Sequence, residues 1–249
     1  MAQTQLAGGT LNHLLRHDPS NDTVKRRTLV SWSSGKDSAW TLHILQQQPD
    51  IEVAGLFCTV NQKHLRVAMH AVRQNLLQRQ ADHIGLPLHI IPLPDPCSHA
   101  EYASAMEDFI HQARRLDIKC MAFGDLYLED VRAYRERNLV GTGIAPLFPL
   151  WGMDTGVLSR EMIAGGLSAY ITCVDPRCLP RDCAGRAYDE SFVHGLPEEV
   201  DPCGENGEFH SFVHDGPMFR QTLAVEVGEI VDRDGFVFAD LLPAHQQAC

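Results

Sequence analysis

The sequence predicts an α/β fold in which a parallel β-sheet has helices on both faces and is followed by a smaller α+β domain. Short apolar runs of strand length alternate with helical runs between residues 28 and 147, which is typical of a parallel sheet with right-handed crossovers. A loop of small residues follows the first apolar run directly. The pattern becomes irregular after residue 148, which indicates a second domain.

The first part of the chain supplies the elements of the predicted sheet. Strands are expected at 28–32, 51–59, 87–92, 119–123 and 143–147, and helices at 37–47, 66–84, 98–116 and 128–138. Ligands of such sheets bind beyond the carboxyl ends of the strands. The loops at 33–38, 58–64 and 124–132 are therefore expected beside one crevice.

The predicted domain boundaries follow from these changes of pattern. Residues 1–24 read as a flexible tail, 25–148 as the sheet domain and 149–243 as the C-terminal domain. In the C-terminal domain we expect a helix over 155–165 and strands near 168–174, 221–231 and 235–241. The stretch 175–217, rich in Pro, Gly, Asp and Glu, is expected to be a functional loop region.

Composition excludes several classes of protein. The 249 residues carry a formal net charge of −11, which argues against nucleic acid as the main partner. No apolar run has the length of a membrane span and no leader pattern is visible, so we expect a cytoplasmic protein without membrane contact. The eight cysteines include no C-x-x-C pair, and the even spacing of Cys173, Cys178 and Cys183 fits no familiar zinc pattern.

The loop after the first strand has the features of a phosphate-binding site. Its residues are Ser33, Ser34, Gly35, Lys36, Asp37 and Ser38. Small side chains let backbone N–H groups approach an anion, and the following helix N-terminus favours negative charge. The loop lacks the Gly spacing of a Walker A motif and of a dinucleotide fingerprint. An ordinary strand-to-helix turn remains the alternative.

A second polar cluster lies between residues 201 and 212. It contains Glu205, Asn206, Glu208 and His210 around two glycines. These side chains could coordinate Mg²⁺, bind ammonia, or act as acid and base. The alternative is a polar turn at the mouth of a hairpin.

Two resemblances give these motifs a specific meaning. Residues 33–38 resemble the S-G-G-x-D-S loop of the PP-loop ATP pyrophosphatases, with Ser34 in place of the first glycine. Together with Gly204–Ser211, and with similar segments at Gly124–Arg132 and Pro149–Trp151, they resemble the diphthine–ammonia ligase family. The likeness spans residues 28–241. It implies a HUP-like sheet domain, related to the adenine nucleotide alpha hydrolases, that binds ATP, and a C-terminal domain that carries the polar loop.

The family resemblance also implies a reaction and a set of site residues. A carboxylate is adenylated by ATP with release of pyrophosphate and is then amidated by ammonia. Residues 33–38 would hold the phosphates, Lys36 would neutralise their charge, Asp37 would hold Mg²⁺, and backbone groups near Cys58 and Thr59 would read adenine. The expected substrate-binding residues are Gly124, Asp125, Arg132 and Asn206. The residues expected to position ammonia or accept its proton are Glu205, Glu208 and His210.

The acid substrate is left open. The forms Trp32–Ser34 and Asp201–Cys203 look most like the bacterial branch of the family, and bacteria are not expected to make diphthamide. The partner is therefore an acidic small molecule or a modified side chain on a protein, and a homo-oligomer is left open. The alternatives are a nucleotide alpha hydrolase with a salvage role, a tRNA-thiolation enzyme, and a non-catalytic ATP-binding protein. Arg135 and Arg137 are expected on a solvated helix face.

Overall fold

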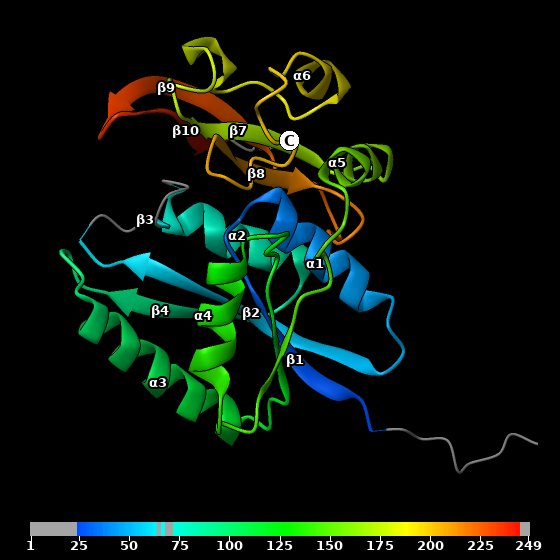
Figure 1. Cartoon of the computed structure of the whole chain (residues 1–249), viewed down its shortest axis with the longest axis vertical. Coiled ribbons are helices and arrows are strands. Elements are labelled where there is room, and N and C mark those ends of the chain that lie inside the picture. Colours follow the sequence, from blue (N-terminus) through cyan, green and yellow to red (C-terminus); the bar gives the residue numbers. More distant parts are fainter. Residues whose placement is uncertain (1–23, 64–65, 68–71, 245–249) are drawn as a thin grey trace, which may run out of the picture.

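The computed structural model describes residues 24–63, 66–67 and 72–244. Within them, a first sheet has its parallel strands in the order β4-β2-β1-β5-β6, and the short antiparallel strand β3 pairs with the end of β2 (Figure 1). The bounds are β1 (Arg26–Ser31), β2 (Ile51–Asn61), β3 (Arg66–Val67), β4 (Leu88–Leu93), β5 (Cys120–Ala122) and β6 (Ala145–Leu147). The predicted parallel sheet is confirmed.

Helices cover both faces of this sheet. Their bounds are α1 (Lys36–Gln46), α2 (Gln74–Ile84), α3 (His99–Arg115) and α4 (Glu129–Leu139). Figure 1 shows α1 and α2 on the face that is turned toward the second sheet, with α3 and α4 on the other side. Met106, Phe109 and Ile110 of α3 pack with Leu29 and Phe57 of the sheet, so this outer face has a core of its own.

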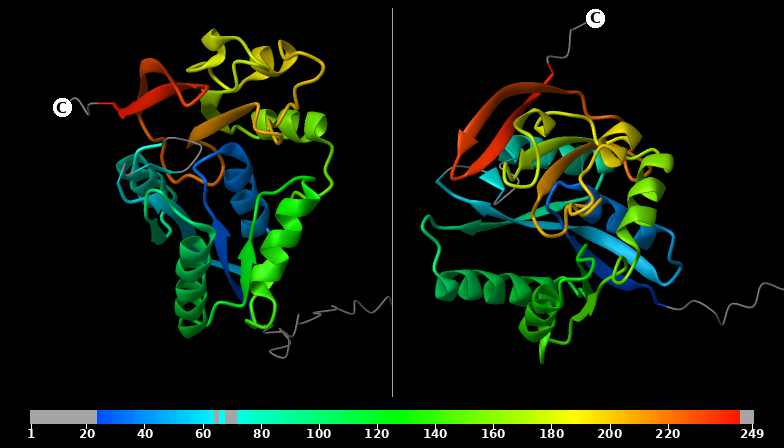
Figure 2. Two further views of the ribbon diagram at one scale, coloured as in Figure 1. Left: turned by 60° about the vertical axis from the view of Figure 1, so that its left-hand side comes forward. Right: turned by 45° about the horizontal axis from the view of Figure 1, so that its top comes forward.

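The second sheet is antiparallel and has the strand order β8-β7-β10-β9. Its strands are β7 (Ser168–Val174), β8 (Phe209–Asp215), β9 (Val225–Arg233) and β10 (Phe236–Pro243). The helices α5 (Thr155–Ala164) and α6 (Glu190–His194) and the 3-10 helix η2 (Arg181–Cys183) accompany it. Figure 2 shows this sheet stacked above α1 and α2. The prediction of a smaller α+β part after the parallel sheet is confirmed.

Two expectations for individual elements are wrong. The helix predicted over 66–84 begins at Gln74, because Arg66 and Val67 instead pair with the end of β2, which extends past β1. The stretch 175–217 contains the whole of strand β8. Its sequence, FHSFVHD, does not alternate between apolar and polar residues and follows directly on the polar loop, so it carries no clear strand pattern. The tail expected for 1–24 lies, except for Val24, outside the described residues.

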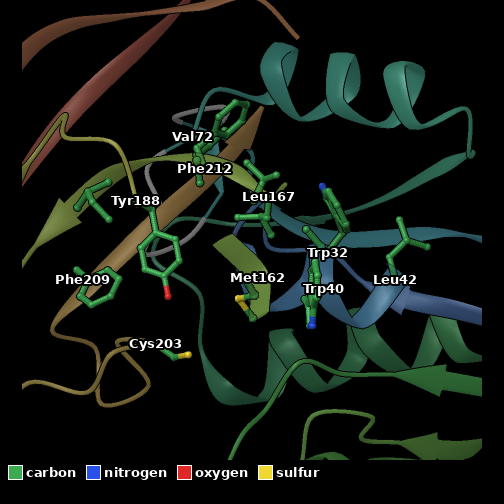
Figure 3. Close-up of a cluster of buried hydrophobic side chains, with 14 of the residues drawn as sticks. Trp32, Trp40, Leu42, Val72, Met162, Leu167, Tyr188, Cys203, Phe209 and Phe212 are labelled. Carbon is green, nitrogen blue, oxygen red and sulfur yellow. The ribbon is translucent and has the colours of Figure 1, made fainter. Parts of the chain in front are cut away.

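One hydrophobic core joins the two sheets. It includes Trp32 and Leu42 from the first part of the chain and Leu167, Phe209 and Phe212 from the second (Figure 3). All five side chains are at most 3% exposed. The position of β8 relative to β1 and α1 is therefore fixed by close packing. Among the described residues, no helix has both the length and the apolar composition needed to cross a membrane.

Candidate active site

The loop at 33–35 lies where β1 ends and α1 begins. Strand β5 pairs in parallel with β1, so the segment after Ala122 leaves the sheet beside this loop. A Cβ atom on Gly124 would lie 3.0 Å from the carbonyl carbon of Asp37 and 3.1 Å from the nitrogen of Ser38. Glycine at 124 thus allows the two segments to touch backbone to backbone.

Ser34 has the backbone conformation that the glycine of the PP-loop pattern would adopt without strain. Its φ of 73° lies in the left-handed region, which a residue with a Cβ atom rarely occupies. The carbonyl oxygen of Ser34 accepts hydrogen bonds from Gln80 Nε2 at 3.1 Å and from the Val213 nitrogen at 2.9 Å. The residue is fully buried. Contacts from α2 and β8 therefore hold the turn.

Hydroxyl groups organise the rest of the loop. Ser38 Oγ donates to the Gly35 carbonyl at 2.9 Å, and the Gly35 nitrogen donates to Ser33 Oγ at 3.4 Å. The Lys36 nitrogen donates to Ser211 Oγ of β8 at 3.2 Å. Gly35 is the N-cap of α1 and provides no side-chain cap. The N-terminus of α1 therefore faces the cavity with small hydroxyls around it, as anion binding requires.

Lys36 is a buried cation at the base of the site. Its side chain is 3% exposed, and Nζ donates to Asp37 Oδ2 at 2.9 Å and to the Cys203 carbonyl. The rings of Tyr188 and Phe209 lie 5.8 and 5.3 Å from Nζ, and Figure 3 shows both near Cys203. Burial opposes the charged form of Lys36, but the surrounding negative groups, Asp37 foremost, outweigh it and raise its pKa. Lys36 is charged at neutral pH.

Asp201 shapes the polar loop after α6. Its Oδ1 accepts from the Cys203 nitrogen at 2.8 Å and from the Glu205 nitrogen at 3.3 Å. Gly204 has a φ of 67°, and a Cβ there would lie 2.8 Å from the Phe209 carbonyl oxygen. The loop therefore folds back tightly and directs Glu205 toward the first domain. Glu205 Oε1 accepts from the Leu126 nitrogen at 2.7 Å, which ties the loop to the segment after β5.

These residues enclose a cavity of about 180 Å³ at the carboxyl ends of β1 and β5. Its lining residues are Ser31, Ser33, Lys36, Asp37, Ser38, Phe123, Gly124, Asp125, Arg135, Cys203, Gly204, Glu205, Phe209, His210 and Ser211. The structure thus brings together two segments that lie far apart in the chain, since the hydrogen-bonded residues Lys36 and Ser211 are 175 positions apart.

The ionisable groups of the cavity are strongly perturbed. Burial raises the pKa of Glu205 to about 7, against the hydrogen bond from Leu126 and with repulsion from Asp37. Burial and the charge of Lys36 lower the pKa of His210 to about 4. Burial also raises the pKa values of Asp37 and Asp125, against the attraction of Lys36 and Arg135 respectively. At neutral pH, His210 is uncharged and Glu205 is close to its titration midpoint.

Glu208 supports the polar loop from behind the cavity. It is 5% exposed, and its Oε1 accepts from the Asp201 nitrogen at 3.1 Å and from Asn206 Nδ2 at 2.9 Å. Neither Glu208 nor Asn206 lines the cavity. Glu208 Oε2 is buried and has no hydrogen-bond partner among the described residues.

The arginines of α4 are arranged differently from the expectation. Arg135 lines the cavity, 3.7 Å from Asp125 Oδ2 and with its guanidinium 5.1 Å from the centre of the Phe123 ring. Arg132 packs against the rings of Phe148 and Trp151, outside the cavity. Arg137 is exposed, as expected. The sequence did not distinguish Arg135, because helix amphipathicity is weak where only one residue of α4, Leu139, is buried.

Two further expectations concern residues at the edge of this arrangement. Cys58 and Thr59 lie within β2 and not in the cavity lining, although the Trp32 nitrogen donates to the neighbouring Phe57 carbonyl at 2.7 Å.

Asp37 Oδ1 is buried and has no hydrogen-bond partner in the described part of the chain, which fits a carboxylate ligand of Mg²⁺. The described residues contain no group of three or more metal-binding side chains.

The sequence reasoning missed Gln80, which is fully buried and contacts the loop. Its signal was present: Gln80 falls on the same helical face as Leu76, Leu77, Ala81 and Ile84, all buried. A polar side chain on an apolar face needs hydrogen-bond partners from the core.

Fold and site together define a two-part α/β protein in which the loop between β1 and α1 faces a polar loop of the C-terminal part across one cavity. Models of the diphthamide synthase family match both parts: the N-terminal domain at residues 26–145 and the C-terminal domain at residues 154–239. The chain belongs to the diphthamide synthase family.

Curated relatives are distant and carry the name diphthine–ammonia ligase. The Danio rerio protein is 26% identical over 190 residues, which cover 74% of this chain and 73% of that protein. The Homo sapiens protein is 31% identical over 118 residues, covering 45% and 44%. The Schizosaccharomyces pombe protein is 27% identical over 120 residues, which span 47% of this chain and 20% of that protein.

Proposed function

We propose that this protein is an ATP-dependent ligase that adenylates a carboxylate, releases pyrophosphate and amidates the acyl adenylate with ammonia. The observation that carries the proposal is the buried, charged Lys36 at the N-terminus of α1, facing Glu205 and His210 across one cavity. Family membership supports it, because the relatives are named for the same class of reaction.

The phosphates of ATP would lie on residues 33–38. Backbone N–H groups of the loop, the N-terminus of α1 and the Lys36 ammonium all favour negative charge there. Arg135 adds a second cation, since its contact with Asp125 is a loose ion pair at 3.7 Å. Mg²⁺ would bind Asp37 and the phosphates and would supply further charge neutralisation. Adenine would extend toward Cys58 and Thr59 on β2.

The first chemical step is attack of a substrate carboxylate oxygen on the α-phosphorus. The bond between the α-phosphorus and the bridging oxygen to the β-phosphate breaks, and pyrophosphate leaves with its electron pair. The protein has no need of a nucleophile here, because positioning and charge neutralisation carry such a step. Lys36 and Arg135 would stabilise the charge on the departing pyrophosphate.

The second step joins ammonia to the activated acid. The nitrogen of ammonia attacks the acyl carbon, AMP leaves with the bridging oxygen, and one proton must be removed from nitrogen. Glu205, with a pKa of about 7, is suited to accept that proton. Uncharged His210 would hold ammonia by accepting a hydrogen bond. Glu208 and Asn206 would keep the polar loop in place, and Gly124, Asp125 and Arg132 would border the acid.

In this proposal residues 25–148 bind ATP and residues 149–243 supply the ammonia-binding groups. The acid is a small molecule or a modified protein side chain, and the relatives' name makes diphthine the first to test.

The test is to incubate the protein with ATP, Mg²⁺, an ammonium salt and a panel of acids that includes diphthine, and to follow AMP, pyrophosphate and amide. We expect AMP and pyrophosphate to form together with an amide. ADP and phosphate would overturn the proposal. AMP without any amide across the panel would favour the nucleotide alpha hydrolase instead.

Lys36→Ala provides the matched negative variant. We expect it to lose ATP cleavage by at least about a hundredfold, since removing one charge-stabilising group typically has that effect. Arg137→Ala, an exposed change on α4, should leave cleavage unchanged. Retention of AMP formation by Lys36→Ala would contradict the assignment of the phosphate site.

A further inference from the structure

Gln80 occupies the point where three parts of the molecule meet. It lies on α2, is fully buried, and makes hydrogen bonds with the Trp32 side chain, with Val213 of β8 and with Ser34 of the loop at residues 33–38, called the phosphate loop below. The loop at 33–35 lies between β1 and α1, and Val213 lies in β8 of the C-terminal sheet. Gln80 therefore links both of them to α2. No other described side chain contacts both Ser34 and Val213 by hydrogen bonds in this way.

The orientation of the Gln80 amide follows from its partners. The indole Nε1 of Trp32 can only donate, and it lies 3.0 Å from Gln80 Oε1. The Nε2 group must then face the Ser34 carbonyl at 3.1 Å and the Val213 carbonyl at 2.6 Å. Both hydrogens of the amide are therefore used on two different backbone carbonyls. A fully buried amide with complete hydrogen bonding has one stable orientation.

The residue that Gln80 holds is the strained one. Ser34 has a φ of 73°, and the left-handed conformation costs a residue with a Cβ atom about 1–2 kcal/mol. The next residues, Gly35 and Lys36, form the N-terminus of α1 beside the cavity, where their amides donate to Ser33 Oγ and Ser211 Oγ. The direction of those amides depends on the conformation of Ser34.

We propose that Gln80 is a positioning residue that imposes the left-handed conformation of Ser34 and thereby sets the phosphate loop for nucleotide binding. The inference rests on the proposed ATP site, but it concerns a residue outside the cavity lining. Glycine in place of Ser34 would adopt the same conformation without help. Gln80 should therefore be needed only while position 34 carries a side chain.

The test is a double-mutant cycle between Gln80→Met and Ser34→Gly, read as the dissociation constant of a non-hydrolysable ATP analogue with Mg²⁺. We expect Gln80→Met to weaken binding about tenfold, which corresponds to about 1.4 kcal/mol. Ser34→Gly alone should change binding little. The double variant should bind nearly as well as Ser34→Gly, although its melting temperature stays low because the Val213 carbonyl has lost its donor. Gln78→Met, an exposed change on the same helix, is the matched control.

A purely structural role for Gln80 would give a different pattern. In that case Ser34→Gly would restore neither nucleotide binding nor the melting temperature when it is combined with Gln80→Met. Unchanged binding in Gln80→Met would also overturn the proposal. If Gln80→Met does not fold, Trp32→Phe removes the hydrogen bond that orients the amide, together with part of a buried ring that lowers the melting temperature. Its weakening of nucleotide binding should still be suppressed by Ser34→Gly, at smaller amplitude.

A second readout separates this proposal from the function it rests on. Hydrogen exchange at the amides of Gly35 and Lys36 should be faster in Gln80→Met than in the wild type and slow again in the double variant, without nucleotide. If the wild type binds no ATP analogue, the proposed function fails, while the exchange pattern still supports or contradicts the role of Gln80.

Discussion

Glu205 shows how burial prepares a single side chain for chemistry near neutral pH. Its pKa is raised from 4.5 to about 7, with burial as the main cause. The folded protein therefore binds this proton more tightly than the unfolded chain does. The resulting stabilisation is present below pH 4.5 and is lost as the pH rises toward 7.

Glu205→Gln should remove this pH dependence. Glutamine keeps an acceptor for the Leu126 nitrogen but has no charge to desolvate. As the pH rises from 5 to 8, we expect the wild type to lose about 1–2 kcal/mol of unfolding free energy relative to the variant. This value is reduced for partial solvent screening. Urea unfolding at several pH values measures it, with the exposed Glu198→Gln as control. A constant difference across this range would contradict the raised pKa.

Arg135 and Arg137 offer a matched pair on one helix. Arg135 faces the cavity beside Asp125, while Arg137 is exposed. We expect Arg135→Ala to raise the KM for ATP about tenfold or more, because a charge-assisted contact to phosphate contributes about 1.5–3 kcal/mol. Arg137→Ala should leave KM unchanged. Equal effects of the two variants would mean that only the overall charge of α4 matters.

At the scale of elements, the site depends on two parallel strands that end side by side. Because β1 pairs with β5, the loops that follow them converge, as the alternation of strands and helices predicted. The sequence did not reveal how closely they approach. That distance is set by Gly124, whose hydrogen lies where a methyl group would meet the backbone of Asp37.

Gly124→Ala should separate these two elements. The added Cβ would meet backbone atoms at 3.0–3.1 Å, so the loop has to shift. We expect a stability loss of about 1–3 kcal/mol and a clear weakening of ATP binding, as for overpacked sites. Gly156→Ala on α5 meets only side-chain atoms, at 3.3 Å or more, and is the control. Full ATP affinity in Gly124→Ala would show that the loop tolerates displacement.

At the scale of the whole molecule, the two sheets act as one packed unit. Phe212 of β8 is fully buried in the core that also contains Trp32 and Leu42. The next residue, Val213, donates its N–H to the Ser34 carbonyl. Packing between the sheets and the geometry of the phosphate loop are thus linked through β8.

Phe212→Ala should therefore affect both stability and nucleotide binding. Removing a buried phenyl ring costs about 3–5 kcal/mol, and we expect the loss to appear in one cooperative unfolding transition. Val227→Ala, on the half-exposed face of β9, should change stability by less than about 1 kcal/mol. Two separate transitions in the wild type, with Phe212→Ala affecting only the second, would show that the sheets unfold independently.

The sequence by itself determined the parallel sheet and the motif at residues 33–38, because local periodicity and the residue types that a turn and a helix N-terminus need are visible in a single chain. The pairing of this motif with the Gly204–Ser211 segment was implied by the family resemblance. It misjudged Arg66–Val67, which pair with the end of the preceding strand β2, and Phe209–Asp215, which pair with β7 from an earlier part of the chain; in both, strand pairing outweighs local preference.

Only the tertiary structure decided which side chains meet. It placed Arg135 in the cavity and Arg132 against Phe148 and Trp151, because the direction of α4 depends on packing that its polar sequence does not encode. It also showed that Ser34 has a left-handed φ, which glycine would adopt without strain, and that its carbonyl oxygen accepts hydrogen bonds from Gln80 and Val213. In our proposal, these hydrogen bonds from residues far away in the chain stabilise a conformation that glycine would adopt without help.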